Sequence, residues 1–238
     1  MHFLTHRCRT AELMDEDAAD ERSLRASLRF IARVNALFGY TRATLAHLDR
    51  FSRSWRSGET VWMLDLATGS ADIPRAILRW ADRRGHDVRI VAVDRHPLTI
   101  RVAAEGPPDP RLQLLQADVF ALPFPPASFD YVLTNMFLHH LDDDEIVRVL
   151  RTMDRLASRG LIAADILRHR RAYLWIKLFT TFSARMVRHD ATASVAQALT
   201  RDEVLALRAR ASIDYAAYHR HFAHRFTLAG EKRGGEGG

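Results

Sequence analysis

Two apolar runs that end in acidic residues are the part of this sequence best suited to chemistry. The first, VWMLDLATGSAD, spans residues 61–72, and the second, IVAVD, ends at Asp94. Small residues after an apolar strand let the backbone approach a ligand closely. A carboxylate at the end of the next strand can accept hydrogen bonds from both hydroxyls of a ribose. Together the two runs predict a site for an adenosine-containing cofactor.

The residues of the first run indicate which cofactor this is. A dinucleotide fingerprint would read G-x-G-x-x-G, but here Ala67 takes the first place, Gly69 the second and Asp72 the third. Asp72 at the start of a helix would repel a diphosphate and attract an ammonium group. S-adenosylmethionine has no phosphate and carries both an amino group and a sulfonium. The charges therefore favour S-adenosylmethionine over NAD.

Four longer segments between about residues 60 and 166 follow one another in a recognisable order: LDLATGSADIP, VAVDRHP, QADVFALPFPPASFDYVLTNMFLHHL and DDDEIVRVLRTMDRLASRGLIAADI. This series resembles the successive motifs of class I S-adenosylmethionine-dependent methyltransferases. The later RHD and LTRDEVLAL segments are similar to the small-molecule branch that includes ubiquinone/menaquinone-type methylases and phenol or polyketide methyltransferases.

The resemblance implies a set of cofactor-binding residues. Asp65 would lie close to the methionine amino group, Asp94 would bind the ribose, and Asp118 would accept a hydrogen bond from the adenine amino group. The full expected set is Asp65, Ala67, Thr68, Gly69, Asp72, Asp94, Arg95, Asp118, Val119 and Asn135. Ala67 and Ala71 replace glycines that are usual in the family. If either position needs a positive φ, alanine costs about 1 kcal/mol there.

His139 and His140 follow the fourth expected strand, where the acceptor would meet the transferable methyl group. A histidine suits proton removal from a phenol because its pKa lies near neutral pH. Adjacent side chains diverge, so we expect one of the two to face the substrate; the alternative is that they pack or cap the turn. Residues 142–145, DDDE, could suggest a metal site, but acids at a helix N-terminus are better explained as a cap. No metal is expected.

Alternating apolar and helical patterns predict a doubly wound, mainly parallel α/β sheet of the Rossmann-like type. Strands are expected at residues 61–66, 89–94, 112–116, 131–135 and 161–165, and helices at 73–80, 97–104 and 144–156. The family resemblance adds an antiparallel hairpin of residues 213–218 and 221–227 at the sheet edge, giving seven strands. On it, His219, His221 and His224 are expected to be surface residues.

The remaining segments surround this sheet. Helical spacing between residues 21 and 51 predicts an N-terminal helical cap within residues 1–55, with residues 11–20 forming a short helix or frayed arm. The methyltransferase domain is expected over residues 56–230, with a helical insertion at about 168–199, and residues 231–238 as a disordered tail.

The insertion has an apolar face between residues 168 and 187 that is too short and too basic to span a bilayer. It is either a core helix or a lid beside the acceptor site. As a lid it would bring Tyr173 and His189 into contact with the acceptor. Interfacial membrane contact is a secondary alternative.

Composition and charge limit the classes of partner molecule that this chain is expected to bind. The chain of 238 residues has a net charge of +6, but its cations are scattered arginines rather than a basic patch, so no nucleic acid partner is expected. Cys8 is the single cysteine, which excludes internal disulfides, and no apolar N-terminal signal is evident. A cytoplasmic enzyme is the simplest interpretation, and a homodimer is left open.

These observations lead to one main hypothesis and two alternatives. The main one is O-methylation of a small, apolar aromatic or polyketide-like acceptor of secondary metabolism, with a histidine as base. The alternatives are C-methylation of a quinol-like ring and a non-catalytic protein that binds S-adenosylmethionine and docks on a partner.

Overall fold

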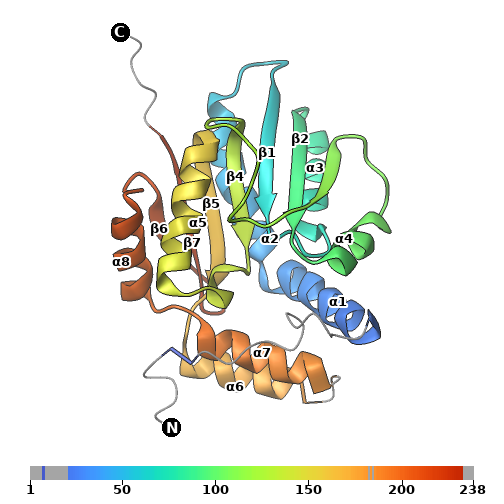
Figure 1. The fold of residues 1–238 in the computed structure, drawn as a ribbon, viewed down its shortest axis with the longest axis vertical. Helices are drawn as coiled ribbons and strands as arrows, with labels where there is room; N and C mark the ends of the chain where they lie inside the picture. The colour runs from blue at the N-terminus through green and yellow to red at the C-terminus, as the bar shows by residue number, and fades with distance from the viewer. Residues whose placement is uncertain (1–6, 9–20, 182, 184, 233–238) are drawn as a thin grey trace.

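The computed structural model describes residues 7–8, 21–181, 183 and 185–232. Within these residues seven strands form a single sheet with helices on both faces (Figure 1). The strands are β1 (Thr60–Leu66), β2 (Asp87–Asp94), β3 (Leu112–Gln116), β4 (Phe129–Asn135), β5 (Ala157–Ile166), β6 (Ala217–His221) and β7 (Arg225–Glu231). Their order is β3-β2-β1-β4-β5-β7-β6, with β1 to β5 parallel and β7 antiparallel to both neighbours. The expected mainly parallel, Rossmann-like sheet is confirmed.

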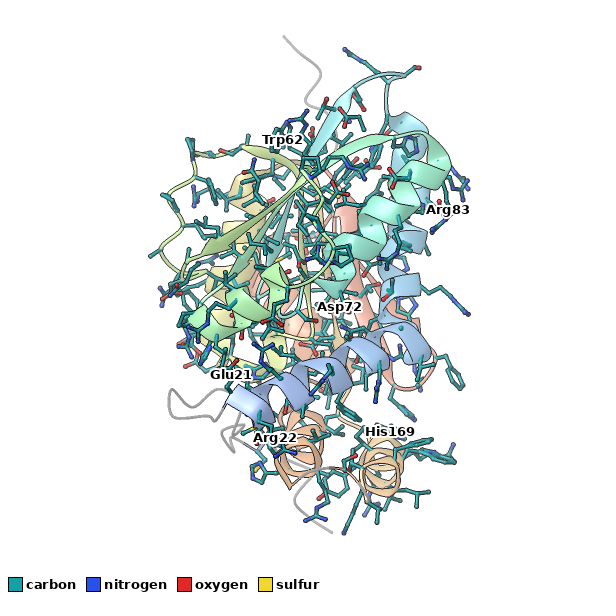
Figure 2. All side chains as sticks on the ribbon, turned by 90° about the vertical axis from the view of Figure 1, so that its right-hand side faces the viewer. Glu21, Arg22, Trp62, Asp72, Arg83 and His169 are labelled. Carbon is teal, nitrogen blue, oxygen red and sulfur yellow. The ribbon has the colours of Figure 1, made fainter. Side chains whose placement is uncertain are left out.

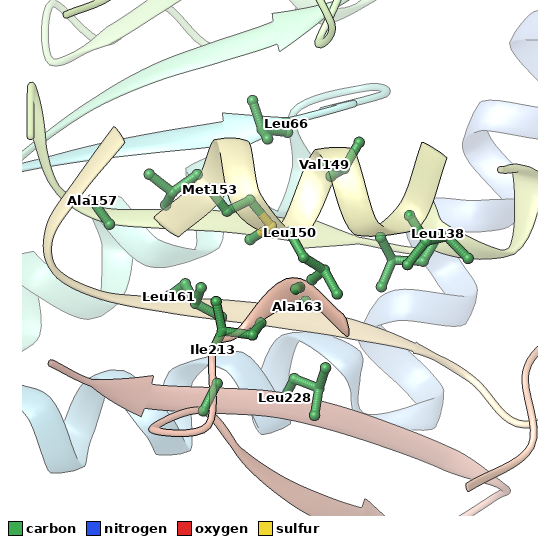
Figure 3. Close-up of a cluster of buried hydrophobic side chains, with 14 of the residues drawn as sticks. Leu66, Leu138, Val149, Leu150, Met153, Ala157, Leu161, Ala163, Ile213 and Leu228 are labelled. Atoms are coloured by element: carbon green, nitrogen blue, oxygen red, sulfur yellow. The ribbon is translucent and has the colours of Figure 1, made fainter. Parts of the chain in front are cut away.

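Helices cover both faces of the sheet, which is why the central strands are almost continuously apolar. On one face lie α2 (Tyr40–Phe51) and α3 (Asp72–Arg84), and on the other α5 (Asp143–Leu156) and α8 (Arg201–Ala211). Figure 3 shows Leu150 and Met153 of α5 packed against the second face. The chain winds from β1 to β2 in one direction and reaches β4 in the other, so the carboxyl ends of β1 and β4 flank a crevice suited to a ligand.

The acids that begin α5 act as a helix cap. Asp142 Oδ1 accepts a hydrogen bond from the Glu145 backbone N–H at 2.8 Å, and Glu145 Oε2 accepts one from the Asp142 N–H at 2.8 Å. This reciprocal pair is a capping box. The capping interpretation of the DDDE segment is confirmed.

Three helices lie across the carboxyl edge of the sheet (Figure 1). They are α1 (Glu21–Phe38), α6 (Arg170–Phe179) and α7 (Arg185–Gln197); α4 (Pro97–Ala104) and the short 3₁₀ turns η2 (Ser52–Ser54) and η3 (Leu138–His140) complete the fold. The apolar segment 168–187 is therefore two helices rather than one. Thr180, which is buried, ends α6 and donates its hydroxyl hydrogen to the Ile176 carbonyl. Phe182 lies outside the described residues.

The expected cap over residues 1–55 does not form one separate unit. Leu48 and Phe51 of α2 pack in the core between α3 and the sheet, whereas α1 lies over the carboxyl edge beside α6 and α7. Residues 11–20, expected to be a helix or arm, lie outside the described residues.

The C-terminal hairpin begins about four residues later than expected. Ile213 and Ala216 are buried in a turn after α8, closed by a hydrogen bond from the Ala216 N–H to the Ile213 carbonyl at 2.9 Å, so they do not begin a strand. The last strand also extends into the expected tail: Glu231 ends β7, and Lys232 Nζ donates to the carbonyls of Asp154 and Ala157. Residues 233–238 lie outside the described part.

Candidate active site

A cavity of about 340 Å³ lies at the carboxyl ends of the parallel strands, with α1 above it. Every residue expected to bind the cofactor lines it: Asp65, Ala67, Thr68, Gly69, Asp72, Asp94, Arg95, Asp118, Val119 and Asn135. The loops after four different strands contribute these residues, so the fold brings together groups that are up to about seventy positions apart in the chain.

The turn after β1 has the left-handed backbone that close approach to a ligand requires. The φ angles of Ala67, Gly69 and Ala71 are 55°, 56° and 57°. Glycine adopts this conformation freely, whereas each alanine costs about 1 kcal/mol. Backbone strain of this kind is typical of ligand-binding turns. Ala67 and Ala71 therefore both have the positive φ at which alanine is less favourable than glycine.

Backbone N–H groups from two loops hold the Asp94 carboxylate in the cavity lining. Its Oδ2 accepts a hydrogen bond from the Gly69 N–H at 2.9 Å, and its Oδ1 accepts one from the His96 N–H at 3.0 Å. A carboxylate oxygen can accept more than one hydrogen bond. Asp94 is therefore fixed in orientation while keeping the capacity to bind a diol.

Two further carboxylates lie deeper in the cavity. Asp65 is only 2% exposed, and burial raises its pKa to about 7, with the nearby charges of Asp72 and Asp94 adding to the effect. Burial also raises the pKa of Asp72, which lies between the sheet and α1 (Figure 2). Such a concentration of carboxylates favours a cationic ligand.

Four buried polar atoms of residues that line this cavity have no hydrogen-bond partner among the described residues: Asp65 Oδ1, Thr68 Oγ1, Asn35 Oδ1 and Asn135 Nδ2. The rest of each amide is held in place. Asn35 Nδ2 donates to Asp72 Oδ2 at 3.0 Å, and Asn135 Oδ1 accepts from the Thr44 hydroxyl at 2.9 Å. Unpaired buried polar groups are costly, so these oriented atoms fit a ligand with both donors and acceptors, such as an amino acid moiety.

Asp65 gives a prediction on stability. In the folded protein it takes up its proton at about pH 7, against 3.8 for an unperturbed aspartate. Between these values the folded state binds more protons than the unfolded state, so the Asp65 contribution to the free energy of unfolding falls as pH rises towards 7. We expect Asp65→Asn to be more stable than the wild type at pH 8, by up to about 4 kcal/mol, and equal to it near pH 4.

Urea unfolding of both proteins from pH 4 to 8 measures this difference. The exposed Asp214 supplies the matched control, because Asp214→Asn should follow the wild type throughout. A difference between Asp65→Asn and wild type that is the same at every pH would contradict the assigned pKa.

A second cavity, of about 90 Å³, adjoins the first and is largely apolar. Residues of α1, α6 and α7 line it, among them Phe30, Val34, Ile176 and Val195. Ile31, Met136 and His140 line both cavities, so the two spaces meet there. We call this second cavity the apolar chamber.

His139 lines the apolar chamber and is paired with Asp165 at the end of β5. The His139 Nδ1 atom lies 2.7 Å from Asp165 Oδ1, and the His139 backbone N–H donates to Asp165 Oδ2 at 3.0 Å. Both side chains are almost fully buried, at 2% and 1% exposure. Burial raises the pKa of Asp165, but the facing His139 and hydrogen bonds from the backbone outweigh it and keep that pKa below its usual value. A carboxylate that fixes one nitrogen of a histidine leaves base chemistry to the other nitrogen.

His140 occupies a different position. Its ring lines both cavities and lies 4.2 Å from the His139 ring, between centroids. The two histidines therefore differ in position: His140 lines both cavities, whereas His139 lines the apolar chamber and pairs with Asp165.

Tyr173 and His189 are the two residues expected to contact the acceptor. They line neither cavity. The inward register of α6 and α7 presents Ile176 and Asp190 to the chamber instead, and the His189 side chain is 40% exposed beside Asp190.

Several residues of the site were missing from the sequence expectation. Asp165 could have been found as an acid at the carboxyl end of a parallel strand, the position that also marks Asp65 and Asp94. Asn35 and Thr44 lie on the N-terminal helices α1 and α2, and no motif in the sequence marks them as site residues. Arg7 gave none either: it donates to the carbonyls of Leu138, His139 and Leu141 in and after η3.

Comparison with known proteins shows that the chain is similar to methyltransferases. The profile of the family described as "Methyltransferase domain" matches residues 63–160. These residues are therefore similar to a methyltransferase domain over less than half of the chain. The matched region contains part of β1, all of β2 to β4, and all ten residues expected at the cofactor.

Part of the chain is also similar to a curated protein, the 2-phytyl-1,4-naphtoquinone methyltransferase of Thermosynechococcus vestitus. The two are 32% identical over 102 residues, which cover 42% of this chain and 43% of the relative. The match thus spans less than half the length of that protein.

Solved structures share the fold at low identity. Human N-acetylserotonin methyltransferase, in complex with SAM, superposes with a TM-score of 0.63 at 15% identity, over 90% of this chain and 56% of that one. A family 2 O-methyltransferase from Planctomyces limnophilus, in complex with apigenin, gives a TM-score of 0.55 at 20% identity, over 93% and 65%. The fold shared with these structures therefore extends beyond the part of the chain that the family profile matches.

Proposed function

We propose that this protein transfers a methyl group from S-adenosylmethionine to a hydroxyl oxygen of a small, apolar aromatic acceptor. The observation that carries the proposal is the junction of two cavities, one rich in carboxylates and one apolar, beside the buried His139–Asp165 pair. The relatives named above act on or bind aromatic molecules, which supports this class of acceptor.

The first cavity suits the cofactor by charge and by hydrogen bonding. Asp94 would bind the ribose hydroxyls, and Asp118 with Val119 would contact the adenine. Asp65, Asn35 and Asn135 would meet the amino acid part with the polar atoms that are otherwise unpaired. When bound, S-adenosylmethionine supplies a methyl group on a positively charged sulfur.

The acceptor would enter the apolar chamber with its hydroxyl towards His139. A phenol with a pKa of about 10 is ionised at pH 7 at a cost of roughly 4 kcal/mol. His139 Nε2 takes the hydroxyl proton, and Asp165 stabilises the resulting imidazolium while holding the ring in place. Alignment of the acceptor oxygen with the methyl group supplies the remaining acceleration.

C-methylation of a quinol-like ring is a second candidate, favoured by the naphthoquinone methyltransferase among the relatives. Here the same base would ionise a ring hydroxyl and raise the electron density on the adjacent carbon. The position of the new methyl group, determined by mass spectrometry and NMR of the product, distinguishes the two reactions.

The proposal is tested first by calorimetry with S-adenosylmethionine and then by turnover against a panel of phenols and quinols. We expect saturable binding and a product that gains one methyl group from labelled cofactor. Binding without turnover on any acceptor, including metabolites of a host extract, would favour the non-catalytic alternative. Absence of binding would overturn the proposal.

A further inference from the structure

The outward face of α6 is apolar, which is unusual for a surface helix. Leu174, Trp175, Leu178 and Phe179 are 53%, 57%, 65% and 58% exposed, and none of the ten residues of α6 is buried. The inward positions carry only Ala172, Tyr173 and Ile176, which are half-buried. Large exposed apolar groups that lie together mark an interaction site.

Cations accompany these apolar residues. Arg170, Arg171 and Lys177 are exposed on the same helix. At 3.6 residues per turn, Arg170 and Lys177 lie along one side of the apolar stripe and Arg171 lies within it. Residues 168–189 contain six lysines and arginines and no aspartate or glutamate. The partner surface should therefore be both apolar and negatively charged.

The tip of the β6–β7 hairpin lies beside the start of this helix. The His224 ring stacks on His169 with centroids 3.7 Å apart, and the nearby Phe222 is 90% exposed. Residues 215–230 contain no acidic residue, and of their two arginines Arg220 is exposed whereas Arg225 is buried. Figure 2 places His169 at the end of the molecule opposite Trp62 and Arg83. The apolar and basic character thus belongs to one end of the protein.

We propose that the exposed side chains of α6, here called the α6 face, dock onto the surface of an anionic lipid bilayer. Apolar side chains of a helix lying in the plane of the interface enter the acyl boundary, and a tryptophan is well suited to that depth. Flanking lysines and arginines bind anionic headgroups. The contact is peripheral, because no helix in the described residues combines the length and apolarity needed to cross a bilayer.

A second copy of this chain fits the α6 face less well. A two-fold interface would bring the same patch of both subunits together. Arg170, Arg171 and Lys177 would then face one another with no carboxylate from residues 168–189 between them, and like charges across an interface are unfavourable.

The α6 face also bears on the proposed function. Ile176, on the other side of the same helix, lines the apolar chamber. If the proposed function holds, docking would place the chamber next to lipid, and the acceptor would be a molecule that partitions into the bilayer.

The test is co-sedimentation of the full chain with vesicles of phosphatidylcholine alone, or with one part in three replaced by phosphatidylglycerol. We expect binding to the anionic vesicles that weakens at high salt. The variant W175S/L178S should bind more than about tenfold more weakly, and R170Q/R171Q about tenfold or more. The charge-matched control R53Q/R83Q, at exposed sites away from α6, should bind within about twofold of the wild type.

Several outcomes would overturn the proposal: no binding to anionic vesicles at low salt, binding that survives W175S/L178S, or equal losses in R53Q/R83Q. A dimer in sedimentation velocity that W175S/L178S dissociates would also overturn it, in favour of a second copy. Calorimetry with S-adenosylmethionine on the same variants reports separately on the proposed function, since no α6 residue other than Ile176 lines either cavity.

Discussion

His139→Gln should lower the turnover of a phenolic acceptor by about 10²–10⁴-fold, the usual contribution of a positioned base. Glutamine keeps the size and polarity of the side chain but cannot take the proton. The loss should be much smaller with a nitro-substituted phenol, which is already ionised at neutral pH. Initial rates at saturating S-adenosylmethionine, measured by mass spectrometry of the product, give both numbers.

The neighbouring residues supply the controls for this result. His140→Gln should lower turnover far less, because the Asp165 carboxylate orients the ring of His139. Asp165→Asn should lower turnover and alter the pH profile of the rate while leaving cofactor affinity unchanged. Equal losses in His139→Gln and His140→Gln, or the same loss with every phenol, would refute the assignment of His139 as base.

The second large effect is expected at the cofactor. Asp94→Asn should weaken the binding of S-adenosylmethionine by about 100-fold, since it removes the charge from two hydrogen bonds that the ribose would make. It also weakens the contacts that orient the turn through Gly69 and His96. Isothermal titration calorimetry measures the dissociation constant directly.

Asp214→Asn, which removes one exposed carboxylate far from the cavity lining, is the matched control and should bind as the wild type does. Since Asp94 is only half-buried, its variant should keep the thermal stability of the fold to within a few degrees. An unchanged dissociation constant in Asp94→Asn would remove the ribose-binding role of this carboxylate.

Features coded by short segments were predictable from the sequence. The turn after β1, the acid that ends β2 and the cap of α5 each depend on fewer than a dozen neighbouring residues. Parallel pairing then brings the ends of these strands to one edge, which is why the sequence predicts that Asp65, Asp94 and Asn135 share one site.

Features that depend on contacts between distant segments were not predictable. Thr180 ends α6 because it is buried, although the apolar pattern continues beyond it. The hairpin register follows from the buried turn at Ile213, and the choice of His139 over His140 follows from Asp165, 26 positions later. Hydrophobic spacing in a single sequence carries none of this information.

Hydrogen bonds from Arg7 to η3 connect the N-terminal part of the chain to the segment that carries His139. The Arg7 guanidinium, 132 residues before the proposed base, donates to the carbonyl of His139 and to those of Leu138 and Leu141 on either side of it. It also donates to the Gln197 carbonyl. Affinity tags, truncations or processing near residue 7 should therefore change the position of the His139 imidazole. Preparations that differ only in their first few amino acids are expected to differ in activity.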